Sequence, residues 1–160
     1  MLVIIEGVDG TGKSTLCKQL STKGYTVIRK NRRDKNFTFG EFTFLQLAKE
    51  KYAIDRALLT PWAYRLLDGK QLDSDDFSLK EIITLLKDSP IIYCNCPNAF
   101  TYSIKRGETN INTIAKSNEL RQIYDFIIGT LQLYNAATIF EYDFEKQTVD
   151  DVINFIKEVN

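Results

Sequence analysis

The sequence predicts an α/β fold in which one parallel sheet is covered by helices on both faces. Short apolar runs rich in β-branched residues recur along the 160 residues without polar alternation, which is typical of strands buried on both sides. Between them lie longer stretches with apolar residues three and four apart, as in helices that bury one face. Because strands and helices alternate throughout, we expect a parallel sheet and a single domain, residues 1–160.

The first expected strand, residues 2–5, leads into a phosphate-binding signature. Residues 7–14 read Gly-Val-Asp-Gly-Thr-Gly-Lys-Ser and match the P-loop pattern G-x-x-x-x-G-K-[ST]. The glycines allow a tight turn whose N–H groups point into one concavity, and the following helix adds its positive N-terminal end. Lys13 is expected to meet the β- and γ-phosphates of a nucleotide, and Ser14 to ligate Mg²⁺. A glycine-rich turn that binds nothing is the alternative, but the position between strand and helix favours the phosphate site.

A second strand at residues 25–28 runs into a basic cluster at residues 29–35. In open α/β sheets, ligands lie outside the carboxyl ends of strands, so this cluster could hold a second phosphate. A solvated run of charges is the alternative interpretation. Residues 36–44 carry four phenylalanines, for which core packing is the default and a wall for a base the other interpretation.

The remaining elements follow from the same two patterns, together with capping residues that indicate helix starts. Thr60 is expected to cap a helix that begins with Pro61, Ser78 and Glu81 to form a capping box, and Thr148 to cap the last helix. In chain order we expect helices at 41–51, from 60 and at 78–87, strands at 52–56, 91–96 and 138–142, helices at 97–108, 118–134 and 149–159, and a polar stretch at 109–117.

The composition excludes several classes of protein. The formal net charge is zero, so no broad basic surface indicates nucleic acid or membrane binding, and no apolar run approaches the length of a bilayer span. The chain begins directly with a strand and lacks a basic leader, so we expect no signal peptide and a cytoplasmic location. The three cysteines are interpreted as buried reduced thiols.

The chain has no histidine, which excludes Ser-His-Asp triads and HExxH zinc sites. Catalysis must therefore use carboxylates, cations, hydroxyl groups and a bound metal. Phosphoryl transfer needs little more than these groups.

Three segments together resemble the thymidylate kinase family and its viral deoxynucleoside monophosphate kinase relatives. Residues 5–15 are similar to that family's EGxDGxGK[ST] form of the P-loop. Asp55-Arg56, followed by Thr60 and Ala63-Tyr64, is similar to its DR-x-x-x-[ST]…AY stretch. The strand at 91–96 with the segment through Lys105-Arg106-Gly107-Glu108 is similar to its helix entering the lid. The resemblance covers nearly the whole chain, although the family's Arg-Glu-Pro stretch after the second strand is missing.

The resemblance implies a three-layer α/β/α P-loop kinase fold with a parallel five-stranded sheet and a short lid at about residues 105–117. It implies that ATP, with Mg²⁺, donates a phosphoryl group to a (deoxy)nucleoside 5′-monophosphate. The implied nucleotide-binding residues are Gly7, Asp9, Gly10, Thr11, Gly12, Lys13, Ser14 and Thr15, with Ser14 and Asp55 at the metal. Asp9 would also meet the sugar hydroxyl, and the acceptor would be bound by Arg29, Arg56, Thr60 and Tyr64. The implied catalytic residues are Lys13, Asp55, Lys105 and Arg106.

The lid residues are included among the implied catalytic residues because of a difference in the P-loop. Part of the family carries a catalytic arginine where this chain has Thr11, so the missing charge would come from Lys105, Arg106, Lys116 or Arg121. We prefer Arg106, whose guanidinium can contact two phosphate oxygens at once. The alternative is that Lys105 and Arg106 merely stabilise the end of a helix. Likewise, a surface ion pair is the alternative for Asp55-Arg56.

Other functions stay open at this point. A deoxynucleoside kinase would phosphorylate a 5′-hydroxyl and would need a general base, whereas the arginines favour a monophosphate acceptor. A polynucleotide 5′-kinase would need a basic stripe, and a nucleotide-binding regulatory module would not need the lid cations. The expected partners are ATP and a nucleoside monophosphate. A homodimer is left open, and neither a membrane nor nucleic acid is expected as a partner.

Overall fold

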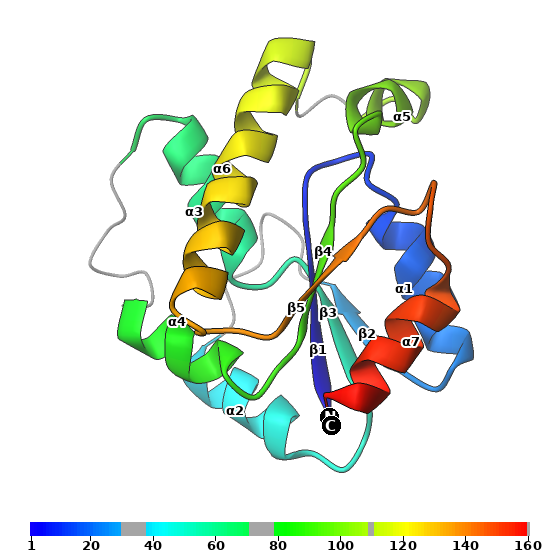
Figure 1. Ribbon diagram of the computed structural model, residues 1–160, viewed down its shortest axis with the longest axis vertical. Coiled ribbons are helices and arrows are strands. Elements are labelled where there is room, and N and C mark those ends of the chain that lie inside the picture. The colour runs from blue at the N-terminus through cyan, green and yellow to red at the C-terminus, as the bar shows by residue number, and fades with distance from the viewer. Residues whose placement is uncertain (30–37, 71–78, 109–110, 160) are drawn as a thin grey trace.

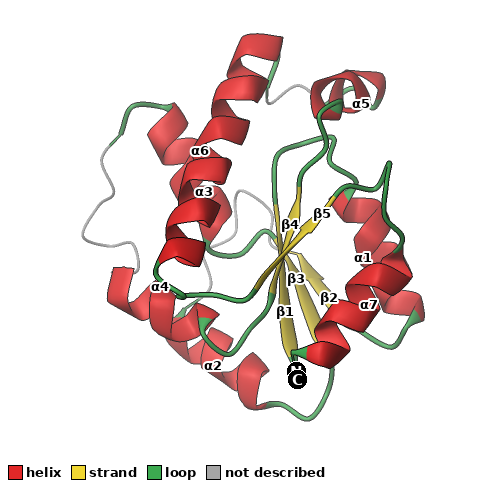
Figure 2. Ribbon diagram, viewed as in Figure 1, coloured by secondary structure: helices red, strands yellow, loops and turns green. Residues whose placement is uncertain are grey.

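The fold is a parallel sheet with helices on both faces, as the sequence predicts (Figures 1 and 2). The computed structural model describes residues 1–29, 38–70, 79–108 and 111–159. Within this part of the chain the sheet has five strands in the order β2-β3-β1-β4-β5, all parallel. The strands are β1 (Leu2–Glu6), β2 (Thr26–Arg29), β3 (Tyr52–Asp55), β4 (Ile91–Cys94) and β5 (Ile139–Tyr142).

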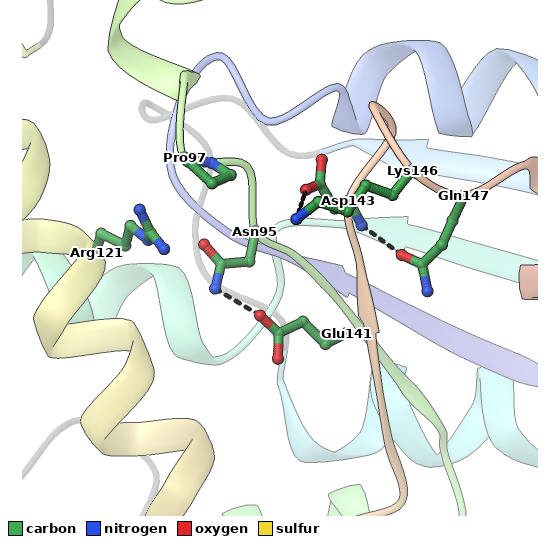
Figure 3. Close-up of a pocket in the computed structure, with 7 residues that line it drawn as sticks. All are labelled: Asn95, Pro97, Arg121, Glu141, Asp143, Lys146 and Gln147. Atoms are coloured by element: carbon green, nitrogen blue, oxygen red, sulfur yellow. Dashed lines mark hydrogen bonds and ion pairs between the residues drawn. The ribbon is translucent and has the colours of Figure 1, made fainter.

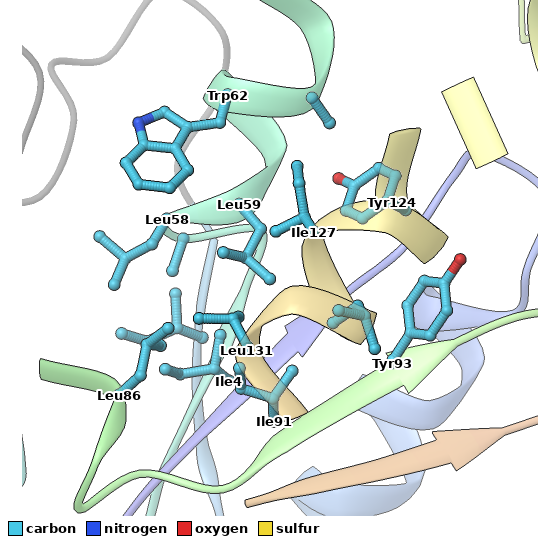
Figure 4. Packing of buried hydrophobic residues seen from close by; sticks show 14 of the residues in the cluster. Ile4, Leu58, Leu59, Trp62, Leu86, Ile91, Tyr93, Tyr124, Ile127 and Leu131 are labelled. Carbon is cyan, nitrogen blue, oxygen red and sulfur yellow. The ribbon is translucent and has the colours of Figure 1, made fainter. Parts of the chain in front are cut away.

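Two groups of helices cover the two faces of the sheet. The apolar side chains along β1 point alternately to one face and to the other, so each face needs its own cover. Leu2 and Ile4 belong to one buried cluster, whereas Val3 and Ile5 belong to the other. The first cluster lies under α2 (Phe39–Leu47), α3 (Leu59–Leu67), α4 (Leu79–Leu86) and α6 (Ile114–Leu133), and Figure 4 shows part of it. The second lies under α1 (Lys13–Thr22) and α7 (Val149–Glu158). A short helix, α5 (Ala99–Lys105), lies beyond the carboxyl ends of the strands (Figure 1).

Several helix boundaries differ from the prediction. The predicted helix 41–51 spans Phe39–Leu47, because Thr38 forms a capping box with Glu41 and the backbone is already extended at Ala48. The helix predicted at 97–108 is shorter and spans Ala99–Lys105.

The longest helix, α6, starts four residues earlier than predicted. Thr113 accepts a hydrogen bond from the backbone N–H of Lys116 at 3.2 Å, so the helix begins at Ile114. Residues 114–117, predicted as part of a polar lid segment, are therefore helical. The predicted cap at Thr148 is confirmed as a capping box with Asp151.

Other predictions about single residues have mixed outcomes. The three cysteines are buried free thiols, as expected. Of the phenylalanines in 36–44, Phe42 is fully buried, whereas Phe44 is 69% exposed, so core packing holds for the first and is wrong for the second. Residues 30–35 of the basic cluster and the capping box expected at Ser78 and Glu81 lie outside the described residues and side chains. Among the helices in the described ranges, none has both the length and the apolar character of a bilayer span.

Candidate functional site

The predicted P-loop lies between β1 and α1, at the carboxyl end of the central strand. Gly7 and Gly10 have positive φ values of 137° and 83°. A Cβ on Gly7 would lie 2.2 Å from the carbonyl oxygen of Cys94, and one on Gly10 would lie 1.8 Å from that of Ala99. Only glycine can therefore hold the loop against the end of β4 and against α5. The helix that follows begins at Lys13, so its free N–H groups face the loop.

Lys13 is buried and its ammonium group is bonded inside the loop. Nζ donates to the carbonyl oxygen of Gly7 at 2.7 Å and to that of Val8, and lies 3.4 Å from Thr11 Oγ1. Burial and the neighbouring guanidinium of Arg56 lower the pKa of Lys13. The structure thus places this predicted catalytic residue in the loop, with its charge shared by the carbonyl oxygens.

Asp9, in the loop, is joined to the end of β3 by Arg56. The Arg56 guanidinium donates to Asp9 Oδ1, and the hydroxyl of Tyr64 on α3 donates to Oδ2 at 3.3 Å. Burial alone would raise the pKa of Asp9, but the charges of Arg56 and Lys13 outweigh it and hold the pKa below its ordinary value. These three predicted residues, Asp9, Arg56 and Tyr64, therefore form one cluster beside the loop.

The backbone of Arg56 is strained. Its φ is 66°, in the left-handed region that side chains other than glycine rarely adopt. Its N–H donates to the carbonyl oxygen of Ile5 at 2.9 Å, which continues the pairing of β3 with β1. Strain of this kind is typical of residues that a ligand site holds in place.

A second cluster joins the ends of β2 and β3 to the start of α1. Arg29 donates from Nε to Asp55 Oδ2 at 2.6 Å and from Nη2 to Ser14 Oγ at 3.1 Å, and its Nη2 is 2.5 Å from the same Asp55 oxygen. Asp55 Oδ1 is buried without a hydrogen-bond partner among the described residues. The two predicted metal ligands, Ser14 and Asp55, are thus brought together by one arginine, and Thr15 beside them is exposed.

Glu6, which the sequence analysis did not name among the site residues, joins the end of β1 to the segment that leads into α3. It is fully buried at the end of β1, and its Oε1 accepts from the N–H groups of Ala57, Leu58 and Leu59 at 2.9–3.0 Å. Its Oε2 accepts from the hydroxyl of Thr60 at 2.6 Å. A glutamate next to a P-loop glycine was the available signal, but sequence alone does not show that it accepts hydrogen bonds from N–H groups 51–53 residues away.

The prediction that Thr60 is the N-cap of a helix is wrong, because Glu6 accepts the hydrogen bonds at this helix start. Helix α3 begins at Leu59 with Leu58 at the N-cap position, since the carboxylate of Glu6 satisfies the free N–H groups. The hydroxyl of Thr60 is instead bonded between Glu6 and the hydroxyl of Tyr124, which lies 2.7 Å away. Both hydrogen bonds of Thr60, a predicted substrate-binding residue, are therefore directed into the protein.

A cavity of about 330 Å³ opens at the carboxyl ends of β4 and β5, beside α6 (Figure 3). It is lined by Asn95, Pro97, Arg121, Glu141, Asp143, Lys146 and Gln147. Asn95 Nδ2 donates to Glu141 Oε1 at 2.7 Å, so the amide oxygen of Asn95 is left to face the cavity. That oxygen and Arg121 Nε are buried without a hydrogen-bond partner in the described part of the chain.

The predicted lid cations lie apart from these clusters. Lys105 and Arg106 end α5 and are both exposed, with Lys105 Nζ 5.9 Å from the ring centre of Tyr102. Lys116 lies in the first turn of α6, and Arg121, on the same helix, borders the cavity. No contact of Lys105 or Arg106 with the P-loop is found among the described residues, so a catalytic role for either stays a prediction.

Comparison with known proteins identifies the fold. No family model matches the sequence, and no curated protein matches it significantly. Solved structures do match over nearly the whole chain. The YorR protein of Bacillus subtilis in complex with phosphorylated GDP is 18% identical, with a TM-score of 0.70 over 99% of this chain and 96% of that one. Deoxyadenosine kinase of M. mycoides with bound dCTP is 20% identical, with a TM-score of 0.68 over 99% and 100%. Thymidylate kinase of Candida albicans is 20% identical, with a TM-score of 0.61 over 99% and 89%.

These likenesses, at such low sequence identity, concern the fold. They agree with the five-stranded parallel sheet and the helices that cover it. The chain thus has the fold of the P-loop nucleotide kinases, as its resemblance to the thymidylate kinase family implies.

Proposed function

We propose that the protein is an ATP-dependent kinase that transfers the γ-phosphoryl group to a (deoxy)nucleoside 5′-monophosphate. The observation that carries this proposal is that Arg29 and Arg56 lie at the ends of the neighbouring strands β2 and β3, where Arg29 contacts Ser14 and Arg56 contacts Asp9 of the P-loop. Guanidinium groups match the planar, bidentate geometry of phosphate oxygens. An acceptor that already carries a phosphate would find two such groups here.

The carboxylates near the P-loop favour a phosphate acceptor over a hydroxyl acceptor. A hydroxyl acceptor needs a general base with a free oxygen in reach. Asp9 is bonded to Arg56 and Tyr64, and Glu6 is bonded to three N–H groups and a hydroxyl inside the fold. Asp55 is bonded through Oδ2 to Arg29, and its other oxygen, Oδ1, has no partner among the described residues. Among these described carboxylates only Asp55 keeps a free oxygen, and Asp55 shares Arg29 with the predicted metal ligand Ser14, so the cations of the site favour a phosphate acceptor.

The residues at the start of α1 fit the donor nucleotide and its metal. Hydroxyl and carboxylate oxygens are the ligands that Mg²⁺ accepts in phosphoryl-transfer sites, and Ser14 Oγ and Asp55 offer both kinds. One cation, Arg29 Nη2, contacts both Ser14 Oγ and Asp55 Oδ2, at 3.1 and 2.5 Å, so these two oxygens are placed to share a metal ion. When bound, Mg²⁺ would neutralise charge on the phosphates of ATP. The loop N–H groups and Lys13 would hold those phosphates in place.

The cavity beside α6 suits a nucleobase. Asn95 Oδ1 has no donor and Arg121 Nε no acceptor among the described residues, and both residues line a cavity at the lower end of the usual size for ligand sites. A base that carries an amino group next to a ring nitrogen supplies both partners. We therefore include this cavity in the proposal as the position of a nucleobase.

The experiment is a coupled ADP-release assay with ATP and Mg²⁺ over all common ribo- and deoxynucleoside 5′-monophosphates, with the parent nucleosides in parallel. We expect turnover with at least one monophosphate and none with its nucleoside. Ser14→Ala, which removes an exposed hydroxyl, should abolish most of that turnover. Lys23→Met is the matched control, since Lys23 is an exposed residue paired with Asp150 at the far end of α1.

Each of the other functions has its own outcome in this assay. Turnover with nucleosides alone would move the protein to the deoxynucleoside kinases, to which the deoxyadenosine kinase likeness also points. Nucleotide binding with no turnover on any acceptor would indicate a regulatory module. Either outcome contradicts the proposed function.

A further inference from the structure

Arg29 places a cation between the two oxygens that the proposed function assigns to a metal. Its guanidinium lies 3.1 Å from Ser14 Oγ and 2.5–2.6 Å from Asp55 Oδ2. The Asp55 side chain is only 4% exposed, whereas that of Arg29 is 49% exposed. The carboxylate is therefore fixed in the fold, and the arginine can leave it toward solvent.

The same two oxygens cannot serve both cations at once. Mg²⁺ binds oxygen ligands at about 2.0–2.1 Å, or through one of its own water molecules, in a compact octahedron. A guanidinium that contacts both oxygens occupies the space between them. A metal held by Ser14 and Asp55 therefore requires that Arg29 withdraw.

Although two cations cannot share this position, the Asp55 carboxylate must keep one positively charged partner. An ionised carboxylate that is buried without a positive partner is strongly destabilising. If Arg29 is replaced by Mg²⁺, Asp55 keeps a partner and the site gains one positive charge.

We propose that Arg29 and Mg²⁺ exchange at the Ser14–Asp55 oxygen pair, so that binding of the metal–nucleotide releases Arg29 toward the acceptor phosphate. This inference rests on the proposed function. It couples the donor side of the site to the acceptor side, since the arginine that leaves Asp55 lies at the end of β2, beside Arg56 at the end of β3. The acceptor phosphate would then gain its second guanidinium only after the donor is loaded.

Calorimetry of ADP binding tests the exchange without any turnover. For each protein, the dissociation constant of ADP is measured once with Mg²⁺ and once with EDTA, and the ratio gives the gain from the metal. In the wild type this gain is reduced, because Mg²⁺ must displace Arg29. The gain should be roughly three- to tenfold larger in Arg29→Met, the range expected when a half-exposed charged contact no longer competes.

Lys23→Met is the matched control, because it also removes one exposed cation from an ion pair, that with Asp150, and its gain should equal that of the wild type. A gain in Arg29→Met that equals or falls below the wild-type gain overturns the exchange. If ADP binds none of the proteins, the proposed function fails together with the inference.

Nuclear magnetic resonance of the Arg29 Nε–H group gives a direct second readout. The resonance is assigned by its loss in Arg29→Lys. With ADP and EDTA it should keep the shift of a hydrogen-bonded guanidinium, and addition of Mg²⁺ should move it. A resonance that stays in place while the backbone signals of the P-loop shift with Mg²⁺ would contradict the exchange and leave the nucleotide site intact.

Discussion

Arg56 combines a strained backbone with a predicted contact to the acceptor phosphate, and two substitutions separate these properties. Arg56→Ala and Arg56→Gly both remove the guanidinium and leave Asp9 without its charged partner. They differ in the backbone alone. At φ 66°, alanine carries the left-handed penalty of about 1–2 kcal/mol, whereas glycine has none. Glycine loses about 0.5–1 kcal/mol more chain entropy on folding.

The difference predicts that Arg56→Gly is more stable than Arg56→Ala by about 0.5–1 kcal/mol. For a chain of this size, this corresponds to a melting temperature about 1–4 °C higher. Both variants should raise the KM for the monophosphate equally, by roughly 10- to 150-fold, because each loses a charged hydrogen bond worth about 1.5–3 kcal/mol. The KM for ATP should change far less.

The assays are thermal melts and initial rates with the acceptor varied at saturating ATP. Equal melting temperatures for the two variants would show that residue 56 is not held in a strained conformation. An unchanged acceptor KM would return Arg56 to the role of an ion pair with Asp9. A difference in KM between the variants would mean that the backbone, and not the side chain, shapes the acceptor site.

We also expect the two Arg56 variants to change how protein stability depends on pH in the acidic range. The charges around Asp9 hold its pKa below the ordinary value, so the stabilisation is fully present above the ordinary pKa and is lost as pH falls through the lowered one. Without Arg56, burial raises the pKa of Asp9 instead, and protonation then favours the folded state. The gap in stability between wild type and variants should therefore narrow from about pH 6 to about pH 3.5, around the ordinary pKa of an aspartate. A constant gap in melts over this range would contradict the lowered pKa.

Three further predictions follow from single residues. Glu6→Gln should lower stability by about 1–3 kcal/mol and raise the acceptor KM, because three N–H groups of the 57–59 turn lose a charged acceptor; melts and kinetics check both. Gly10→Ala should lower the melting temperature much more than Gly24→Ala, since both have positive φ but only the first Cβ meets backbone, and equal losses would show that the space around the loop does not matter. Arg106→Ala should reduce kcat by at least ~100-fold with little change in melting temperature if it acts on the phosphoryl group. If it only ends α5, kcat should be intact and stability should fall by a few tenths of a kcal/mol.

The sequence predicts the fold well because each strand and helix carries its own local pattern. The buried runs at residues 2–5 and Ile91–Cys94 are apolar on both faces, and the P-loop marks the turn from the first strand into the first helix. Boundaries are less predictable where a distant residue decides them. Helix α3 begins at Leu59 because Glu6 reaches its N-terminus, and Thr60, a good N-cap by composition, is used elsewhere.

In the candidate site, too, local motifs can be predicted from the sequence, whereas contacts between distant residues cannot. Residues of the P-loop and the Asp55-Arg56 pair are recognisable by type and spacing, and the structure brings them together at the strand ends. Their partners are not recognisable in this way, since Arg29 and Ser14 are 15 residues apart and Arg56 and Asp9 are 47 apart. Nor does spacing reveal a strained φ at Arg56, which depends on the pairing of β3 with β1.

The partners of the cations describe how this site would receive phosphate. Lys13 is bonded to the carbonyl oxygens of its own loop, Arg56 to Asp9, and Arg29 to Asp55. Each of the three cations is satisfied by an oxygen of the protein, so the fold does not bear the cost of burying unpaired positive charges. A phosphate that binds here must offer these cations better oxygens than the ones they already hold. Phosphate binding is then an exchange of partners, and its selectivity depends on how many of the three cations one ligand can recruit at once.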